Sequence, residues 1–179
     1  MKWFAAIFSL GFIASNVQAM PVEGLDIYKL KLSSPSENLD GHYLSIDGAV
    51  LGVHEAEFAA VKVYFASSEK PGYSELHTYP IGIVDHALGL CGSDGLLTLK
   101  DTVNPAGVKP DEGQVFQWDV FQIANGKLTN HGEGSWLAFP AAEGGWTLKW
   151  SDGTAFVTTD YMPVEIVLES VGKAIYKLD

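Results

Sequence analysis

The chain has 179 residues, 11 lysines and no arginine against 22 acidic residues, and a formal net charge of −11 at pH 7. A surface of this sign repels nucleic acid and anionic membranes, so neither is expected as a partner. Cys91 is the only cysteine, which excludes an intramolecular disulfide.

The N-terminal segment has the three parts of a secretory signal peptide. Lys2 gives a positive n-region, residues 3–13 form an apolar h-region, and Val17-Gln18-Ala19 places small residues before a cleavage site. The apolar run is shorter than the ~20 residues needed to span a bilayer. We therefore expect residues 1–19 to be removed, leaving one domain, residues 20–179, that is secreted to the extracellular space or the cell wall. Loss of Lys2 takes the net charge from −11 to −12.

The rest of the chain predicts strands and turns almost throughout. Alternating apolar positions and turn dipeptides such as Asp94-Gly95 and Asn125-Gly126 delimit short extended segments. The expected strands are 25–32, 42–46, 50–54, 61–65, 76–84, 87–91, 96–100, 116–123, 127–128, 135–139, 145–150, 154–159 and 164–171. The fold class is therefore all-β, with less than about one-tenth helix. A single antiparallel β-barrel or a two-sheet sandwich is expected, with a β-trefoil as the alternative.

The core is expected to come from apolar residues at alternating positions of these strands. Its predicted members are Leu30, Leu44, Val63, Phe65, Ile83, Leu97, Leu99, Trp118, Val120, Leu137, Leu148, Ile166 and Leu168.

The titratable residues follow no recognisable catalytic or metal-binding pattern. His54-Glu55-Ala56-Glu57 matches no metal motif, and a strand would send His54 and Glu55 to opposite faces. Asp85-His86 could orient a histidine, but no nucleophile elbow accompanies it. We therefore expect no enzyme activity, no catalytic residue, no cofactor and no metal.

The tryptophans are more informative, because four of them fall between residues 118 and 150. Trp146, Leu148 and Trp150 share one face of an uninterrupted strand. Leu148 favours burial of that face, which would make the tryptophans part of the core. If the face were exposed, Trp136, Trp146 and Trp150 would be the candidates for carbohydrate contact, and the domain would be an extracellular lectin-like carbohydrate-binding module.

One stretch resembles a known family. The matching segments include Ile81 to Gly89, Asp94 to Leu99, Phe116 to Val120, Gly126-Lys127-Leu128, Leu137-Ala138-Phe139-Pro140, Gly144 to Gly153 and Val164 to Glu169. Over residues 81–171 the chain resembles the fungal PhiA-type cell-wall proteins. The resemblance implies a non-enzymatic, secreted or cell-wall-associated structural or developmental protein. Its expected partners are cell-wall polysaccharide or another wall protein.

Overall fold

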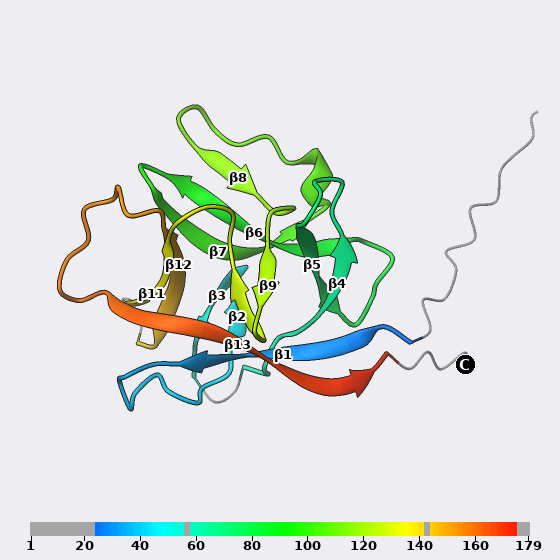
Figure 1. Cartoon of the computed structure of the whole chain (residues 1–179), viewed down its shortest axis with the longest axis horizontal. Coiled ribbons are helices and arrows are strands. Elements are labelled where there is room, and N and C mark those ends of the chain that lie inside the picture. The colour runs from blue at the N-terminus through cyan, green and yellow to red at the C-terminus, as the bar shows by residue number, and fades with distance from the viewer. Residues whose placement is uncertain (1–23, 56–57, 142–143, 175–179) are drawn as a thin grey trace, which may run out of the picture.

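The computed structural model describes residues 24–55, 58–141 and 144–174. Strands make up 54% of this part of the chain, which contains no α-helix, and nine of them close into an antiparallel β-barrel. Figure 1 shows the barrel with short additional strands around it. The all-β prediction is confirmed, and of the architectures that the sequence left open the structure adopts the closed antiparallel barrel. The signal peptide expected over residues 1–19 lies outside the described residues.

Thirteen strands belong to one hydrogen-bonded sheet, and one short 3₁₀ turn, η1 (Pro105–Gly107), follows β7. The strands are β1 (Asp26–Ser33), β2 (Ser45–Asp47), β3 (Val50–Val53), β4 (Lys62–Ser67), β5 (Ser74–Tyr79), β6 (His86–Ser93), β7 (Leu96–Val103), β8 (Val115–Gln117), β9 (Gln122–Ala124), β10 (Lys127–Thr129), β11 (Ser135–Pro140), β12 (Trp146–Ser151) and β13 (Met162–Lys173).

The barrel runs in the order β1-β4-β5-β6-β7-β3-β12-β11-β13 and closes where β13 pairs with β1. This closing pair is antiparallel and extends from Asp26 opposite Lys173 to Ser33 opposite Glu165. The other edge of β13 pairs with β11 through Val164 and with β10 through Ile166. The long strand β13 thus pairs with β1 along one edge and with β10 and β11 along the other.

The remaining short strands extend the sheet outside the closed ring. β2 pairs with β3, β8 pairs with β6, and the β9–β10 hairpin lies on β13. The β6–β7 and β9–β10 connections are tight two-residue turns. Their central residues, Asp94-Gly95 and Asn125-Gly126, all have positive φ, as turns of this kind require.

The barrel interior is filled mainly by leucines, with two tryptophans and one phenylalanine. Period-two alternation explains this filling, because successive side chains of a strand point to opposite faces. In β12, Leu148 and Trp150 are buried, while Thr147 and Lys149, which alternate with them, are half-exposed. The predicted core residues that the structure buries are Leu30, Leu44, Val63, Leu97, Leu99, Val120, Leu137, Leu148 and Ile166.

The prediction that Ile83 is a core residue is wrong, because its side chain is 107% exposed. The expected strand 76–84 ends at Tyr79, and the chain then leaves the sheet at Pro80. Proline has no N–H with which to continue a ladder of hydrogen bonds. Residues 81–85 therefore form a surface loop despite their apolar character.

Two other expected strands also differ from the structure. The expected strand 116–123 is divided into β8 and β9, so that Trp118 lies in the connection and is only half-buried. Residues 154–159 form a loop rather than a strand. Phe65 and Leu168, both predicted core residues, are partly buried and pack against the core from its edge. Among the described residues, no helix has the length and apolar character needed to cross a membrane.

Candidate functional site

The structure places the tryptophans mostly inside the barrel. Trp136 and Trp150 are each 3% exposed, and Trp146 is half-buried against the core. The indole Nε1 of Trp136 donates a hydrogen bond of 2.7 Å to the backbone oxygen of Leu128. An indole that is closed to solvent cannot stack on a sugar ring. Trp136 and Trp150 therefore do not form the exposed aromatic face that carbohydrate stacking would need.

Two histidines form close pairs with carboxylates, but not the pair suggested by the adjacent Asp85 and His86. Asp85 Oδ1 lies 2.7 Å from Nδ1 of His77, and Asp101 Oδ2 lies 2.8 Å from Nδ1 of His86. The sequence neighbours separate because Asp85 ends a loop whereas His86 begins β6. No serine or threonine hydroxyl and no cysteine thiol in the described residues hydrogen-bonds to either imidazole as a nucleophile would.

His54 makes a local contact rather than a metal-binding one. Its Nε2 lies 3.2 Å from the backbone oxygen of Val50, and its ring packs against Phe58. Glu55 is exposed, and Glu57 lies outside the described residues. Within residues 24–55, 58–141 and 144–174, no three His, Cys, Asp or Glu side chains converge as a metal site would require.

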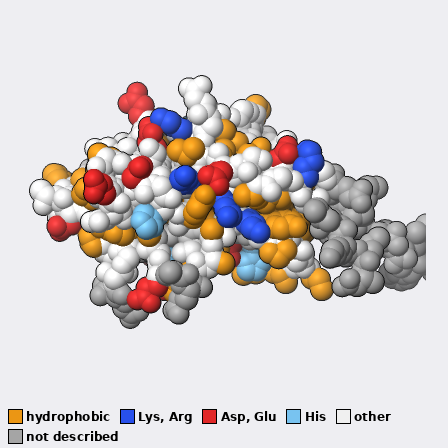
Figure 2. All heavy atoms as spheres, turned by 90° about the horizontal axis from the view of Figure 1, so that it is seen from below, with side chains coloured by type: hydrophobic (Ala, Val, Ile, Leu, Met, Phe, Trp, Pro, Cys, Tyr) orange, Lys and Arg blue, Asp and Glu red, His pale blue; other side chains and the backbone are white. Residues whose placement is uncertain are grey.

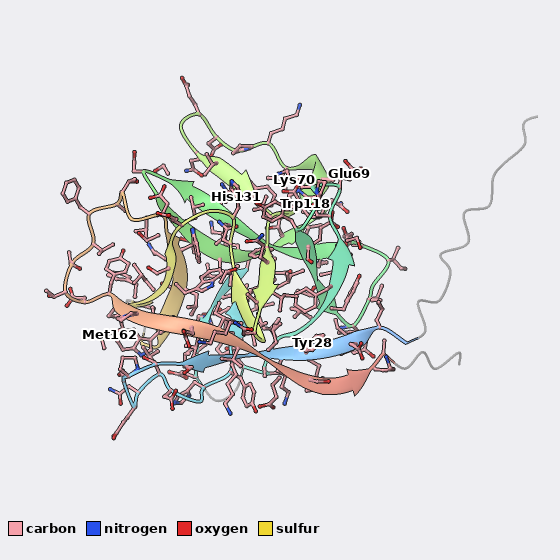
Figure 3. All side chains as sticks on the ribbon, in the orientation of Figure 1. Tyr28, Glu69, Lys70, Trp118, His131 and Met162 are labelled. Atoms are coloured by element: carbon pink, nitrogen blue, oxygen red, sulfur yellow. The ribbon has the colours of Figure 1, made fainter. Side chains whose placement is uncertain are left out.

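A partly polar cavity lies at one end of the barrel, where β6 and β12 end and β7 and β11 begin. We call it the rim pocket; its volume is about 390 Å³, within the range of small-molecule sites. His131, which lines it, is labelled beneath β8 in Figure 3. The polar side chains of the lining are Ser93, Asp94, Gln117, Asn130, His131, Glu133 and Asp152, and Leu97, Val115 and Trp150 supply apolar surface.

One wall of the rim pocket is formed where the β6–β7 turn meets the end of β12. The backbone N–H of Asp152 donates to the oxygen of Gly95 at 3.0 Å. Gly95 has φ +73°, and a Cβ there would overlap Oδ1 of Asp152 and Oγ1 of Thr154. Only glycine permits both this backbone conformation and this close approach. The turn residue therefore sets the position of the Asp152 carboxylate.

Asp152 is held in its ionised form by the loop that follows β12. Thr154 donates to Oδ1 of Asp152 twice, from its hydroxyl at 2.7 Å and from its backbone N–H at 2.9 Å. These bonds, the hydroxyl bond most strongly, hold the pKa of Asp152 below its ordinary value. Because both bonds go to Oδ1, Oδ2 keeps its capacity to accept from a ligand.

A buried amide lies at the opposite side of the lining. Asn130 is 3% exposed, and its Nδ2 donates to Oε1 of Gln117 at 2.9 Å. Its Oδ1 is buried and has no hydrogen-bond partner in the described residues. Leaving a buried acceptor without a donor costs about 1–3 kcal/mol. Asn130 also lines the rim pocket, so a donor is the kind of partner that this amide lacks there.

His131 is fixed by Tyr73, which reaches it from the segment before β5. The Tyr73 hydroxyl and Nδ1 of His131 are 2.6 Å apart, and the two rings meet edge to face. This contact occupies Nδ1 and leaves Nε2 as the ring nitrogen for a further partner. The pocket thus offers donors and acceptors of several kinds around a space large enough for a small polar molecule.

Sequence reasoning did not identify the rim pocket, because its residues come from four separate segments. These are 93–97, 113–117, 130–133 and 150–152. Each segment on its own resembles an ordinary polar turn or strand end. The pairing of β6 with β8 and of β7 with β12 brings three of these segments together, and the hydrogen bond from Asn130 to Gln117 joins the fourth. Of the three predicted contact residues, Trp150 alone lines the pocket, and it does so as part of the core.

Comparison with family models, with curated proteins and with solved structures finds nothing that matches this chain.

Proposed function

We propose that this chain is a non-enzymatic secreted protein, associated with the cell wall, that binds a saccharide in the rim pocket. The observation that carries the binding activity is the buried Asn130 amide, whose Oδ1 lacks a donor in the described residues and which lines a polar cavity. Sugar hydroxyls both donate and accept, so they can satisfy this oxygen and the neighbouring carboxylates together. The signal-peptide pattern and the resemblance to PhiA-type proteins support the extracellular location.

The non-enzymatic role is supported by the arrangement of the titratable groups. The two histidine–carboxylate pairs, at His77 and His86, have no serine, threonine or cysteine nucleophile bound to them in the described residues. A scaffold role is supported by Trp136 and Trp150, which are used for core packing. Binding and scaffolding are compatible, because the pocket lies at one end of the barrel and leaves its outer faces free.

The test of this function is a glycan array probed with the secreted protein, followed by calorimetric titration of the strongest oligosaccharide. We expect binding to be lost or weakened at least about tenfold in Asn130→Ala and Gln117→Ala, because a charge-neutral hydrogen-bond network of this kind contributes on the order of one decade in affinity. Asn38→Ala is the matched control, since Asn38 is exposed on the loop after β1. Absence of any glycan binding, or equal loss in the control, would contradict the proposal.

The location has its own test. Mass spectrometry of the protein recovered from culture medium and from the wall fraction should give a mature chain that begins at Met20. Retention of the complete chain inside the cell would remove the support for an extracellular role.

A further inference from the structure

The charged groups of the rim pocket are of one sign. Asp94, Glu133 and Asp152 line it, and no lysine among the described residues does. His131 also lines the pocket as a titratable side chain, and its Nδ1 is engaged by Tyr73. Three carboxylates around a small cavity repel an anionic ligand and attract a cationic one. A saccharide with carboxylate or sulfate groups is therefore disfavoured here.

Three lysines of the molecule lie on another face, away from the rim pocket. Lys29 and Lys31 of β1 lie over the ring of Tyr43, and Lys127 pairs with Glu165 of β13 at 2.7 Å. Figure 2 shows basic side chains gathered on this lower face, beside acidic ones. The carboxylates of the pocket consequently have no cationic side chain among the described residues that line it. These exposed carboxylates therefore favour a ligand that carries positive charge.

A second feature of the same pocket is a buried amide without a donor for its oxygen. Asn130 is 3% exposed, and its Oδ1 has no partner in the described residues, while its Nδ2 is already bound to Gln117. An amide oxygen accepts from a hydroxyl as well as from an ammonium group. The lining therefore suits a ligand that combines hydrogen-bond donors with positive charge.

We propose that the rim pocket binds a saccharide that carries a free amino group, with the ammonium group among Asp94, Glu133 and Asp152 and a ring hydroxyl toward Asn130. This inference rests on the proposed saccharide binding and specifies its ligand class. An N-acetylated sugar has the hydroxyls but no positive charge to balance the three carboxylates. A lysine side chain has the charge but lacks the ring hydroxyls of a saccharide.

The experiment compares four probes by calorimetric titration of the secreted protein at mildly acidic pH. The probes are a β-1,4-linked glucosamine tetramer, its fully N-acetylated counterpart, a neutral glucose tetramer and tetralysine. We expect the glucosamine tetramer to bind at least about tenfold more tightly than each of the others, because charge-assisted hydrogen bonds are about twice as strong as neutral ones. Its affinity should also fall as salt is added, whereas that of a neutral tetramer should not.

Two matched variants locate the effect. Asp152→Asn keeps the shape of the side chain and an Oδ1 that can accept from Thr154, and it should weaken binding of the glucosamine tetramer about tenfold more than it weakens binding of the neutral tetramer. Asp160→Asn is the control, since Asp160 lies in the same loop, accepts from Thr158 and does not line the pocket. Glu133→Gln replaces Asp152→Asn if circular dichroism shows that the latter is misfolded.

The outcomes separate this inference from the proposed function. Equal binding of the N-acetylated or neutral tetramer overturns the amino-sugar specificity and leaves saccharide binding intact. Binding of tetralysine as tight as that of the glucosamine tetramer, or equal losses in Asp152→Asn and Asp160→Asn, shows attraction by overall charge and also overturns it. If no saccharide binds, both proposals fail.

Discussion

The indole rings of Trp136 and Trp150 meet edge to face across the β11–β12 pair, with centroids 5.1 Å apart and planes inclined by 73°. The two residues are direct cross-strand partners in the register of these strands. This geometry is one that aromatic pairs prefer, and it contributes beyond the burial of the rings themselves. Both residues belong to the hydrophobic core, and Trp150 also lines the rim pocket at this end of the barrel.

Replacing Trp150 by alanine should destabilise the fold strongly. Truncation of a buried tryptophan typically costs about 3–5 kcal/mol, from lost burial and from the cavity left behind. Trp146→Ala should cost less, because Trp146 is half-buried. Urea unfolding followed by fluorescence measures both. Phe156→Ala is the control, since Phe156 is 104% exposed and its loss should change stability by less than about 0.5 kcal/mol. A Trp150→Ala protein as stable as this control would refute the core assignment.

Gly95→Ala should both destabilise the protein and displace Asp152. The added Cβ would overlap the side chains of Asp152 and Thr154, and alanine at φ +73° is strained. Gly153→Ala separates the two effects, because Gly153 has φ +85° and a Cβ added there would meet no atom within 4 Å. We expect about 1–3 kcal/mol of backbone strain in both variants. In Gly95→Ala, the chemical shifts of Asp152, across the contact, should change strongly. In Gly153→Ala, the chemical shifts of Asp94, on the other side of the same contact, should change far less. Equal losses of thermal stability together with equal shift changes in the two variants would argue against the close approach.

Removal of the Thr154 hydroxyl should raise the pKa of Asp152 toward its ordinary value. The hydroxyl bond is the largest cause of the depressed pKa, and Thr154→Val removes it while the backbone N–H still donates. A carboxyl whose pKa is depressed in the folded state contributes stability at pH values above its unfolded pKa, and that contribution is lost as the pH falls through the folded pKa.

The stability difference between wild type and Thr154→Val should therefore be present at neutral pH and disappear in acid. Carbon-13 titration of the Asp152 carboxyl gives the pKa directly. Thr158→Val, which removes the bond to Asp160, serves as the comparison and should leave the titration of Asp152 unchanged. An unaltered Asp152 titration in Thr154→Val would contradict the assigned cause.

His77 lies between two carboxylates, and removing it should be costly. Its Nδ1 is 2.7 Å from Asp85 and its Nε2 is 3.0 Å from Glu75, while Tyr64 stacks on the ring. His77→Ala leaves the mostly buried Glu75 without this partner, so we expect a loss of about 3–5 kcal/mol. Adding Glu75→Gln should recover part of the loss in a double-mutant cycle measured by urea unfolding.

The exposed ion pair between Lys173 and Asp26 provides the comparison for His77. Both of its side chains are largely exposed, so Lys173→Ala should cost no more than about 1 kcal/mol. If His77→Ala were as mild as Lys173→Ala, or if Glu75→Gln restored nothing, the carboxylate contacts would not be the source of the stabilisation.

The sequence was sufficient to predict the all-β class and many of the buried positions, because alternation along a strand is a local property. Leu148 and Trp150 show this, since their spacing alone places them on one buried face. Ile83 shows the limit of such reasoning. Its apolar neighbours resemble a strand, but whether a strand continues depends on a pairing partner that the local pattern does not reveal.

The rim pocket could not be predicted for a related reason. Asp152 and Gly95 are 57 positions apart (152 − 95), and their contact exists only because β7 and β12 are neighbours in the barrel. Asn130 reads in the sequence as one more polar residue after a short strand. Its burial against Gln117 depends on how β8 and β10 are placed by their own partners.

The pairing of β1 with β13 also governs when the molecule can fold. Asp26 and Lys173 are 147 positions apart, so the ring stays open until nearly all of the described chain is present. Folds dominated by such distant pairings form slowly, because the entropy cost of closing a long loop precedes the stabilisation by the contacts that the closure allows. A chain emerging from the ribosome consequently remains unfolded for longer than one built from local hairpins alone. The pairing of β13 with β1 is therefore the step that completes the ring.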